Sequence, residues 1–146
     1  HIMVWGCIRS DGSRLLIRCG STVNSAEYQR ILDTALPQIC NSRYFFQDDG
    51  ASSHRTASTQ QYKLNKQGRC LTFWPAQSPD LSLIENLWEI LNEKVKKRAP
   101  ENLDSLWNVA LEEWNNIPNE TITHLYNSTR RRLNAVMQSK GSYTRY

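Results

Sequence analysis

Three carboxylates occupy positions where an α/β fold would support metal-dependent chemistry. Asp48 and Asp49 follow the aromatic run Tyr44–Phe46, and Gly50 after them permits a sharp turn. Glu85 lies in the first turn of a long helical segment further along the chain. Ligands of open α/β sheets bind at the carboxyl ends of strands, and Mg²⁺ prefers oxygen ligands. Carboxylates that converge there would hold divalent ions, which activate water and stabilise the leaving oxygen in phosphodiester cleavage.

Each of these residues also has a structural interpretation. Asp48-Asp49-Gly50 is a typical turn sequence. Ser82-Leu83-Ile84-Glu85 matches the S-x-x-E capping box, in which the glutamate returns a hydrogen bond to the start of the helix. His54, shortly after the aspartates, suits contact with a phosphate or a metal-bound water, and equally helix capping or packing. The residues alone leave these alternatives open.

The strands expected to position these residues are short. Val4–Arg9 and Arg14–Cys19 are predicted strands, and Asp11-Gly12 between them favours a tight antiparallel hairpin. Further short strands are expected at Tyr44–Phe46 and Leu71–Trp74, the second stopped by a proline.

Helices are predicted between and after these strands. Asn24 is the expected N-cap of the first helix, which Pro37 closes or just follows. The longest helix starts after Ser82, and its apolar stripe continues to Val95 before Pro100 ends it. The other predicted helices are Arg55 to Lys66, ending near Gly68, then Leu103 to Trp114 and Glu120 to Met137. This order of elements predicts one α/β domain with a mixed sheet flanked by helices.

The charge of the chain favours a polyanionic partner. The formal net charge is +4, and basic residues cluster in the C-terminal half. Such clusters bind nucleic acid through phosphate neutralisation and counterion release, although each cluster alone also fits a solvated helix face. The candidate DNA-binding residues are Lys94, Lys96, Lys97, Arg98, Arg130, Arg131 and Arg132, with Lys140 and Arg145 beyond them.

Other classes of protein fit the sequence less well. The longest apolar runs are far too short to span a membrane, so no membrane partner is expected. Cys7, Cys19, Cys40 and Cys70 lack zinc-like spacing, which favours the reduced thiols of a cytosolic or nuclear protein. Trp88, Trp107 and Trp114 lie at helical spacing, for which core packing is the default.

Several motifs in order resemble those of the mariner-superfamily DDE transposases. Residues 74 to 88, W-P-A-Q-S-P-D-L-S-L-I-E-N-L-W, are similar to the family signature W-P-x-x-S-P-D-L-N-P-I-E-x-x-W. Residues 46 to 54, F-Q-D-D-G-A-S-S-H, resemble its Q-D-[NG]-A-x-x-H segment. The M-V-W-G-C-I start and the R-R-L-N-A-V segment near the end are also similar to family motifs, and by this likeness Tyr146 is expected to be a native C-terminus.

The resemblance assigns roles to individual residues. Glu85 matches the third catalytic acid, and Asp49 matches the second when glycine follows the acid. Asp48 is the alternative one register earlier. Trp74 and Gln77 are weaker candidates for DNA contact. Leu83 stands where proline is common in the family, which implies only a small cost in stability.

The fold implied by the resemblance is ribonuclease H-like. The first catalytic aspartate of the family lies on a strand before the hairpin, and Asp11, in the hairpin turn, does not replace it. We therefore expect residues 1–146 to be the C-terminal two-thirds of a DDE transposase or integrase catalytic domain. We expect it to lack the first strand and the N-terminal helix-turn-helix domain, and to be inactive alone.

The implied function is that of a DNA transposase catalytic core. In the complete enzyme, two magnesium or manganese ions held partly by Asp49 and Glu85 would support cleavage and strand transfer at transposon ends. The resemblance also implies transposon and target DNA as partners, a homo-oligomer and a nuclear location. The alternatives are a catalytically dead remnant that binds DNA or protein and, more remotely, a ribonuclease H or Holliday-junction nuclease.

Overall fold

The predicted N-terminal hairpin is present in the computed structural model of the chain. Strand β1 (Val4–Ile8) pairs with β2 (Arg14–Arg18), and the turn is closed by a hydrogen bond from Arg9 N to Ser13 O of 2.8 Å. Gly12 has a φ of +91°, which favours glycine over any residue with a Cβ atom. The Asp-Gly pair therefore forms the turn that the sequence predicted.

The structure describes the whole chain except residues 40–42, 68–69, 72–73, 75–77, 140–143 and 145–146. The chain divides into two compact units. One contains residues 3–5 and 17–77, and the other contains residues 1–2, 6–16 and 78–146.

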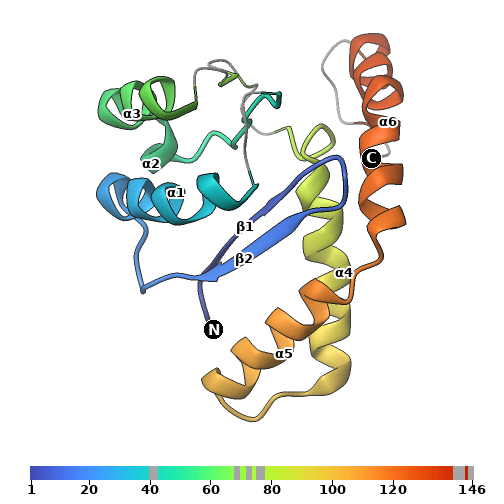
Figure 1. Ribbon diagram of the computed structural model, residues 1–146. Helices are drawn as coiled ribbons and strands as arrows, with labels where there is room; N and C mark the ends of the chain where they lie inside the picture. Colours follow the sequence, from blue (N-terminus) through green and yellow to red (C-terminus); the bar gives the residue numbers. More distant parts are fainter. Residues whose placement is uncertain (40–42, 68–69, 72–73, 75–77, 140–143, 145–146) are drawn as a thin grey trace. The chain divides into compact units, whose positions relative to one another are not determined.

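The first unit contains helices α1 (Ser25–Ile39), α2 (Ser52–Arg55) and α3 (Ala57–Gln67) (Figure 1). The side chain of Asn24 accepts a hydrogen bond from Glu27 N at 2.9 Å, as expected for the N-cap. The core of this unit is formed by buried residues of α1, against which partly buried residues from the other segments pack. The buried residues are Tyr28, Leu32 and Leu36, and the residues around them are Trp5, Val23, Phe46 and Tyr62.

Two of the helices in this unit differ from the sequence prediction. Helix α1 continues two residues past Pro37, although proline has no N–H to donate within the helix. The helix predicted from Arg55 to Lys66 is divided at Thr56, whose extended backbone (ψ 147°) ends α2. The hydroxyl of Thr56 then accepts a hydrogen bond from Thr59 N at 3.3 Å and starts α3.

The strand predicted at Tyr44–Phe46 is reduced to a single bridge. Phe46 pairs in parallel with Cys70, while Phe45 is 64% exposed. A strand assignment requires a continuous ladder, and the described part of this segment shows an isolated bridge instead. Much of the strand expected at Leu71–Trp74 lies outside the described residues, as do Cys40, Gly68, Gln77, Lys140, Arg145 and Tyr146.

The second unit contains helices α4 (Leu83–Arg98), α5 (Leu103–Asn115) and α6 (Asn119–Gln138). Helix α4 packs against both of the others, and Figure 1 shows α5 crossing its C-terminal half. Trp88 of α4 stacks on the fully buried Trp114 of α5, with ring centroids 4.9 Å apart. The expected core role of these two tryptophans is confirmed.

Gly6 of β1 is required by the same aromatic pair. A Cβ atom at this position would lie 2.6 Å from Trp88 Cη2. The glycine of the hairpin therefore allows the strand to approach the tryptophan ring closely. None of the described helices is long and apolar enough to cross a membrane.

Candidate active site

Asp48 is partly buried in a polar cluster of the first unit, with its side chain 13% exposed. Its carboxylate accepts hydrogen bonds from Lys63 Nζ at 2.8 and 3.1 Å and from Tyr28 Oη at 2.7 Å. The Lys63 side chain is only 1% exposed, and its third hydrogen bond goes to His54 O at 3.2 Å. Both partners of the ion pair are thus satisfied inside the protein. Asp48 is therefore engaged in a structural role.

Asp49 has the opposite environment. Its side chain is 64% exposed, and Oδ1 lies 2.7 Å from His54 Nδ1 and accepts a hydrogen bond from Ala51 N at 2.9 Å. These two partners lower the pKa of the Asp49 carboxyl below its ordinary value, with His54 the larger cause. Within the described part of the chain both contacts fall on Oδ1, so Oδ2 remains available as a metal ligand.

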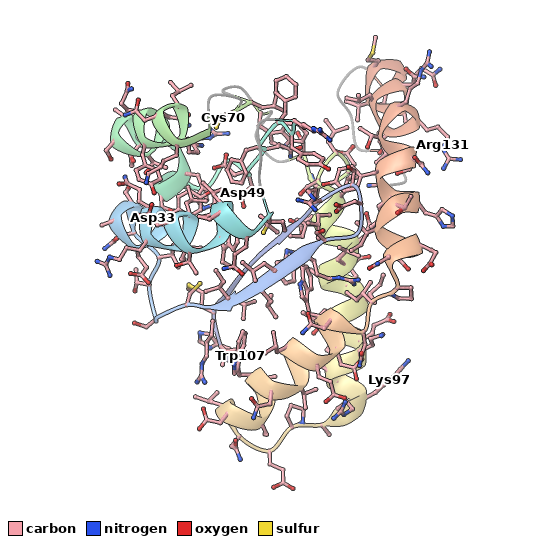
Figure 2. All side chains as sticks on the ribbon, viewed as in Figure 1. Asp33, Asp49, Cys70, Lys97, Trp107 and Arg131 are labelled. Carbon is pink, nitrogen blue, oxygen red and sulfur yellow. The ribbon has the colours of Figure 1, made fainter. Side chains whose placement is uncertain are left out.

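The loop that carries Asp49 is held by local sequence. Ala51 N returns to the aspartate two residues before it, a local turn that aspartate forms readily. The His54 ring stacks on Tyr28 with centroids 3.8 Å apart and a tilt of 24°. Figure 2 labels Asp49 in the segment that leads into α2. His54 therefore fixes the aspartate from one side and packs on the core from the other.

Glu85 lies in the first turn of α4 and is exposed. The alternative capping-box interpretation is wrong, since the Ser82 side chain makes no capping hydrogen bond. The backbone N–H of Ser82 donates instead to Pro79 O at 3.0 Å, so it is not available to the glutamate. Glu85 is thus not committed to the cap that its spacing from Ser82 suggested.

The two candidate acids belong to different units: Asp49 to the first and Glu85 to the second. In the residues that the structure describes, no group of three or more His, Cys, Asp or Glu side chains is arranged to hold a metal ion.

The predicted basic cluster of α4 is partly neutralised. Arg98 bonds to Glu112 and Glu113 of α5 at 3.1 and 3.0 Å, and Lys94 lies 3.4 Å from Glu113. Lys96 and Lys97 are exposed, and Figure 2 shows Lys97 near the C-terminal end of the helix. Surface pairs of this kind contribute little to stability, yet they reduce the net positive charge offered to a phosphate.

The three consecutive arginines of α6 differ in their exposure to solvent. Arg130 and Arg131 are exposed, and Figure 2 labels Arg131 on this helix. Arg132 is only 4% exposed and donates hydrogen bonds to Ser128, Asp80 O and Asn86. The structure thus gives Arg132 protein partners where the sequence predicted a DNA contact, because helical geometry turns the third consecutive side chain of the run towards α4.

Sequence reasoning missed the contribution of Lys63 and Tyr28. Both residues lie on the inner faces of their helices, with Tyr28 0% and Lys63 1% exposed. A lysine in the polar segment of α3 gives no sign that it is buried, because lysine is almost always exposed. The available signal was the unusual pair Asp48-Asp49, in which two adjacent carboxylates imply a cationic partner for one of them.

The chain is similar to known transposases over nearly its whole length. The family model of the DDE superfamily endonucleases matches residues 1–107. The Tc1 transposase of Caenorhabditis elegans is 32% identical over 149 residues, which cover 99% of this chain and 54% of Tc1. The Tc3 transposase of the same organism is 34% identical over 152 residues, covering 99% and 46%.

The solved structure of the catalytic domain of Mos1 mariner transposase has a similar fold. It matches with a TM-score of 0.83 at 21% identity, covering 98% of this chain and 76% of that domain. The predicted ribonuclease H-like fold is therefore confirmed.

The chain belongs to the DDE superfamily of endonucleases. Within that superfamily, the chain is similar to the Tc1 and Tc3 transposases in sequence and to the catalytic domain of Mos1 mariner transposase in fold. It spans about half the length of the curated relatives that it matches.

Proposed function

We propose that the complete protein cuts and joins DNA phosphodiester bonds at transposon ends, with Asp49 and Glu85 as two of its metal ligands. The observation that carries this proposal is the contrast between two adjacent aspartates. Asp48 is 13% exposed and paired with Lys63, whereas Asp49 is 64% exposed, and the nearby His54 lowers the pKa of its carboxyl. Of the two registers, the one that assigns the second acid to Asp49 fits this contrast.

The proposed cofactor is magnesium or manganese, with two ions in the complete enzyme. Carboxylate oxygens are the ligands that these hard cations prefer. The Mos1 catalytic domain has been solved with Mg, and the Mos1 paired end complex with Mn. When bound, such ions supply a nucleophile from water and stabilise charge at the transferred phosphate.

In this proposal the carboxylates of the chain bind the metal ions and its exposed basic residues contact DNA. Asp49 presents Oδ2, while the contacts of Oδ1 with His54 and Ala51 N fix its orientation. Glu85 supplies a second carboxylate from the first turn of α4. The exposed residues Lys96, Lys97, Arg130 and Arg131 would contact phosphates of transposon or target DNA.

Two further proposals follow from the likeness to transposases. We expect the complete protein to act as a homo-oligomer, because a transposase must handle two ends of its element together. We also expect a nuclear location, where the proposed DNA substrate lies.

A manganese titration followed by calorimetry tests the metal ligands. Metal binding is the appropriate readout because the chain spans only about half the length of Tc1 and Tc3. The wild-type chain should bind manganese, and Asp49→Asn combined with Glu85→Gln should abolish that binding. Glu93→Gln, an exposed glutamate two turns further along α4, is the matched control and should bind normally.

Equal binding by the wild type and the double variant would contradict the assignment of these ligands. No binding in either protein would instead favour a remnant that acts by binding DNA or protein. Loss of binding in Asp48→Asn but not in Asp49→Asn would select the other register.

A further inference from the structure

The buried guanidinium of Arg132 bridges the two segments that flank Glu85. Nη1 donates to Asp80 O at 2.9 Å, and Nη2 donates to the side-chain oxygen of Asn86 at 2.8 Å. Asp80 lies in the turn before α4, and Asn86 directly follows Glu85 in its first turn. The planar fork of arginine can satisfy both acceptors at once, with a geometry that lysine cannot reproduce.

The arginine is itself held in a fixed orientation. Nε donates to Ser128 Oγ at 2.8 Å, and the serine hydroxyl donates to Leu125 O one turn earlier at 2.6 Å. All three guanidinium nitrogens therefore have a partner, and the side chain is 4% exposed. A rigid donor of this kind can transmit the position of α6 to the start of α4.

At the start of α4 the structure shows local backbone hydrogen bonds, from Ser82 N to Pro79 O and from Glu85 N to Ser82 O. The Ser82 side chain makes no capping hydrogen bond, whereas α5 begins with a complete capping box between Asn102 and Ser105. The turn before α4 is also tied to the C-terminal segment, because Thr144 Oγ1 lies 3.0 Å from Asp80 Oδ2. Tertiary contacts therefore hold the helix start that carries Glu85.

Burial of the guanidinium is expensive, since the effective desolvation penalty of a buried ion is several kcal/mol. Two further arginines precede it in the sequence and remain exposed. A neutral apolar residue at position 132 would fill the same space without this penalty. Packing alone therefore does not account for an arginine at this position.

We propose that Arg132 is a positioning residue for Glu85, holding the first turn of α4 so that the carboxylate is ready to bind a metal ion. This inference rests on the proposed function for its metal-binding consequence, and on the contacts above for its structural part. In this proposal Arg132 acts through its hydrogen bonds to the protein and not as a ligand of metal or DNA.

Whether replacement of Arg132 weakens or tightens manganese binding separates this role from a simple effect of charge. Removing a positive charge should tighten the binding of a divalent cation, since the repulsion between them falls. Loss of a positioning contact should weaken binding, by about tenfold to a hundredfold as for other residues that orient metal ligands. Arg132→Met is therefore expected to bind manganese more weakly than the wild type.

Two variants provide the controls. Arg132→Lys keeps the charge but not the fork, so a positioning role predicts weaker binding and a charge effect predicts no change. Arg30→Met removes the same charge from an arginine that is 74% exposed, and it should not weaken binding. If Arg132→Met does not fold by circular dichroism, Arg132→Lys becomes the deciding variant.

Hydrogen exchange without metal tests the structural part separately. Amides of residues 82–87 should exchange faster in Arg132→Lys than in the wild type, while amides of α5 keep their protection. Wild-type manganese affinity together with wild-type exchange in this variant would overturn the proposal. If the wild type binds no manganese, the proposed metal ligands fail, and the exchange of residues 82–87 alone decides whether Arg132 positions this segment.

Discussion

Replacement of Lys63 should show that Asp48 has a structural role, in contrast to the proposed metal-binding role of Asp49. Lys63→Met leaves the carboxylate of Asp48 without its cationic partner in a site where the two side chains are 1% and 13% exposed. Breaking a buried ion pair on one side costs about 3–5 kcal/mol. We expect about 3 kcal/mol, the lower end, because Tyr28 continues to donate to the same carboxylate.

Urea denaturation at pH 7, followed by far-UV circular dichroism, measures this loss. Asp48→Asn should also destabilise the protein, by about 2 kcal/mol, because it leaves the buried Lys63 ammonium without its counter-charge. The double variant should lose clearly less than the sum of the single variants, since neither charge then remains unpaired.

Asp49→Asn provides the contrast within the same loop. Its carboxylate is 64% exposed, so its removal should cost less than about 1 kcal/mol. The same variant should nevertheless lose manganese binding. Additive single losses at positions 48 and 63, or a larger loss of stability for Asp49→Asn than for Asp48→Asn, would refute the reasoning.

Four further predictions concern other parts of the molecule. Gly6→Ala should lower the free energy of unfolding by about 1–3 kcal/mol, since the new methyl group would lie 2.6 Å from the Trp88 ring. A loss below about 0.5 kcal/mol, the usual range for surface substitutions, would mean that the ring moves away freely. Ala99→Gly should raise the midpoint of thermal unfolding, because the left-handed φ of 44° at this C-cap costs a residue with a Cβ atom about 1 kcal/mol. Tyr126 donates a hydrogen bond to Ile8 O, and burial raises its pKa from 10.0 to about 12. Its contribution to stability is complete below pH 10.0 and is lost as pH rises to about 12. In urea denaturation at several pH values, Tyr126→Phe should therefore lose less stability than the wild type across that range. Arg131→Ala should weaken DNA binding for all sequences and lower the slope of log affinity against log salt by about 1, measured by fluorescence anisotropy; an unchanged slope would remove this residue from the DNA surface.

The secondary structure was largely predictable because its signals are local. The Asp-Gly turn, the Asn24 N-cap and the apolar stripe of α4 each depend on residues within a few positions of one another. The strand expected at Tyr44–Phe46 was wrong for the opposite reason. A ladder depends on a distant partner, and only the bridge from Phe46 to Cys70 forms among the described residues.

The identity of the candidate acids came from the sequence, through ordered motifs that place Asp49 and Glu85 in family positions. Their environments came from the tertiary structure. Nothing local distinguishes Asp48 from Asp49 until Lys63, fifteen residues later, pairs with the first of them. Burial depends on which face of α3 meets the core, and a polar sequence does not reveal that face.

The same reason explains the outcome at Arg132. Three consecutive arginines have the same charge and the same expected affinity for phosphate, so the sequence determined only that this helix is basic. A helix turns by about 100° per residue, since 3.6 residues complete a turn, and neighbouring side chains therefore meet different surroundings. Packing of α6 against α4 decided that Arg132 is buried beside the segment of Glu85, while Arg130 and Arg131 stay exposed to solvent.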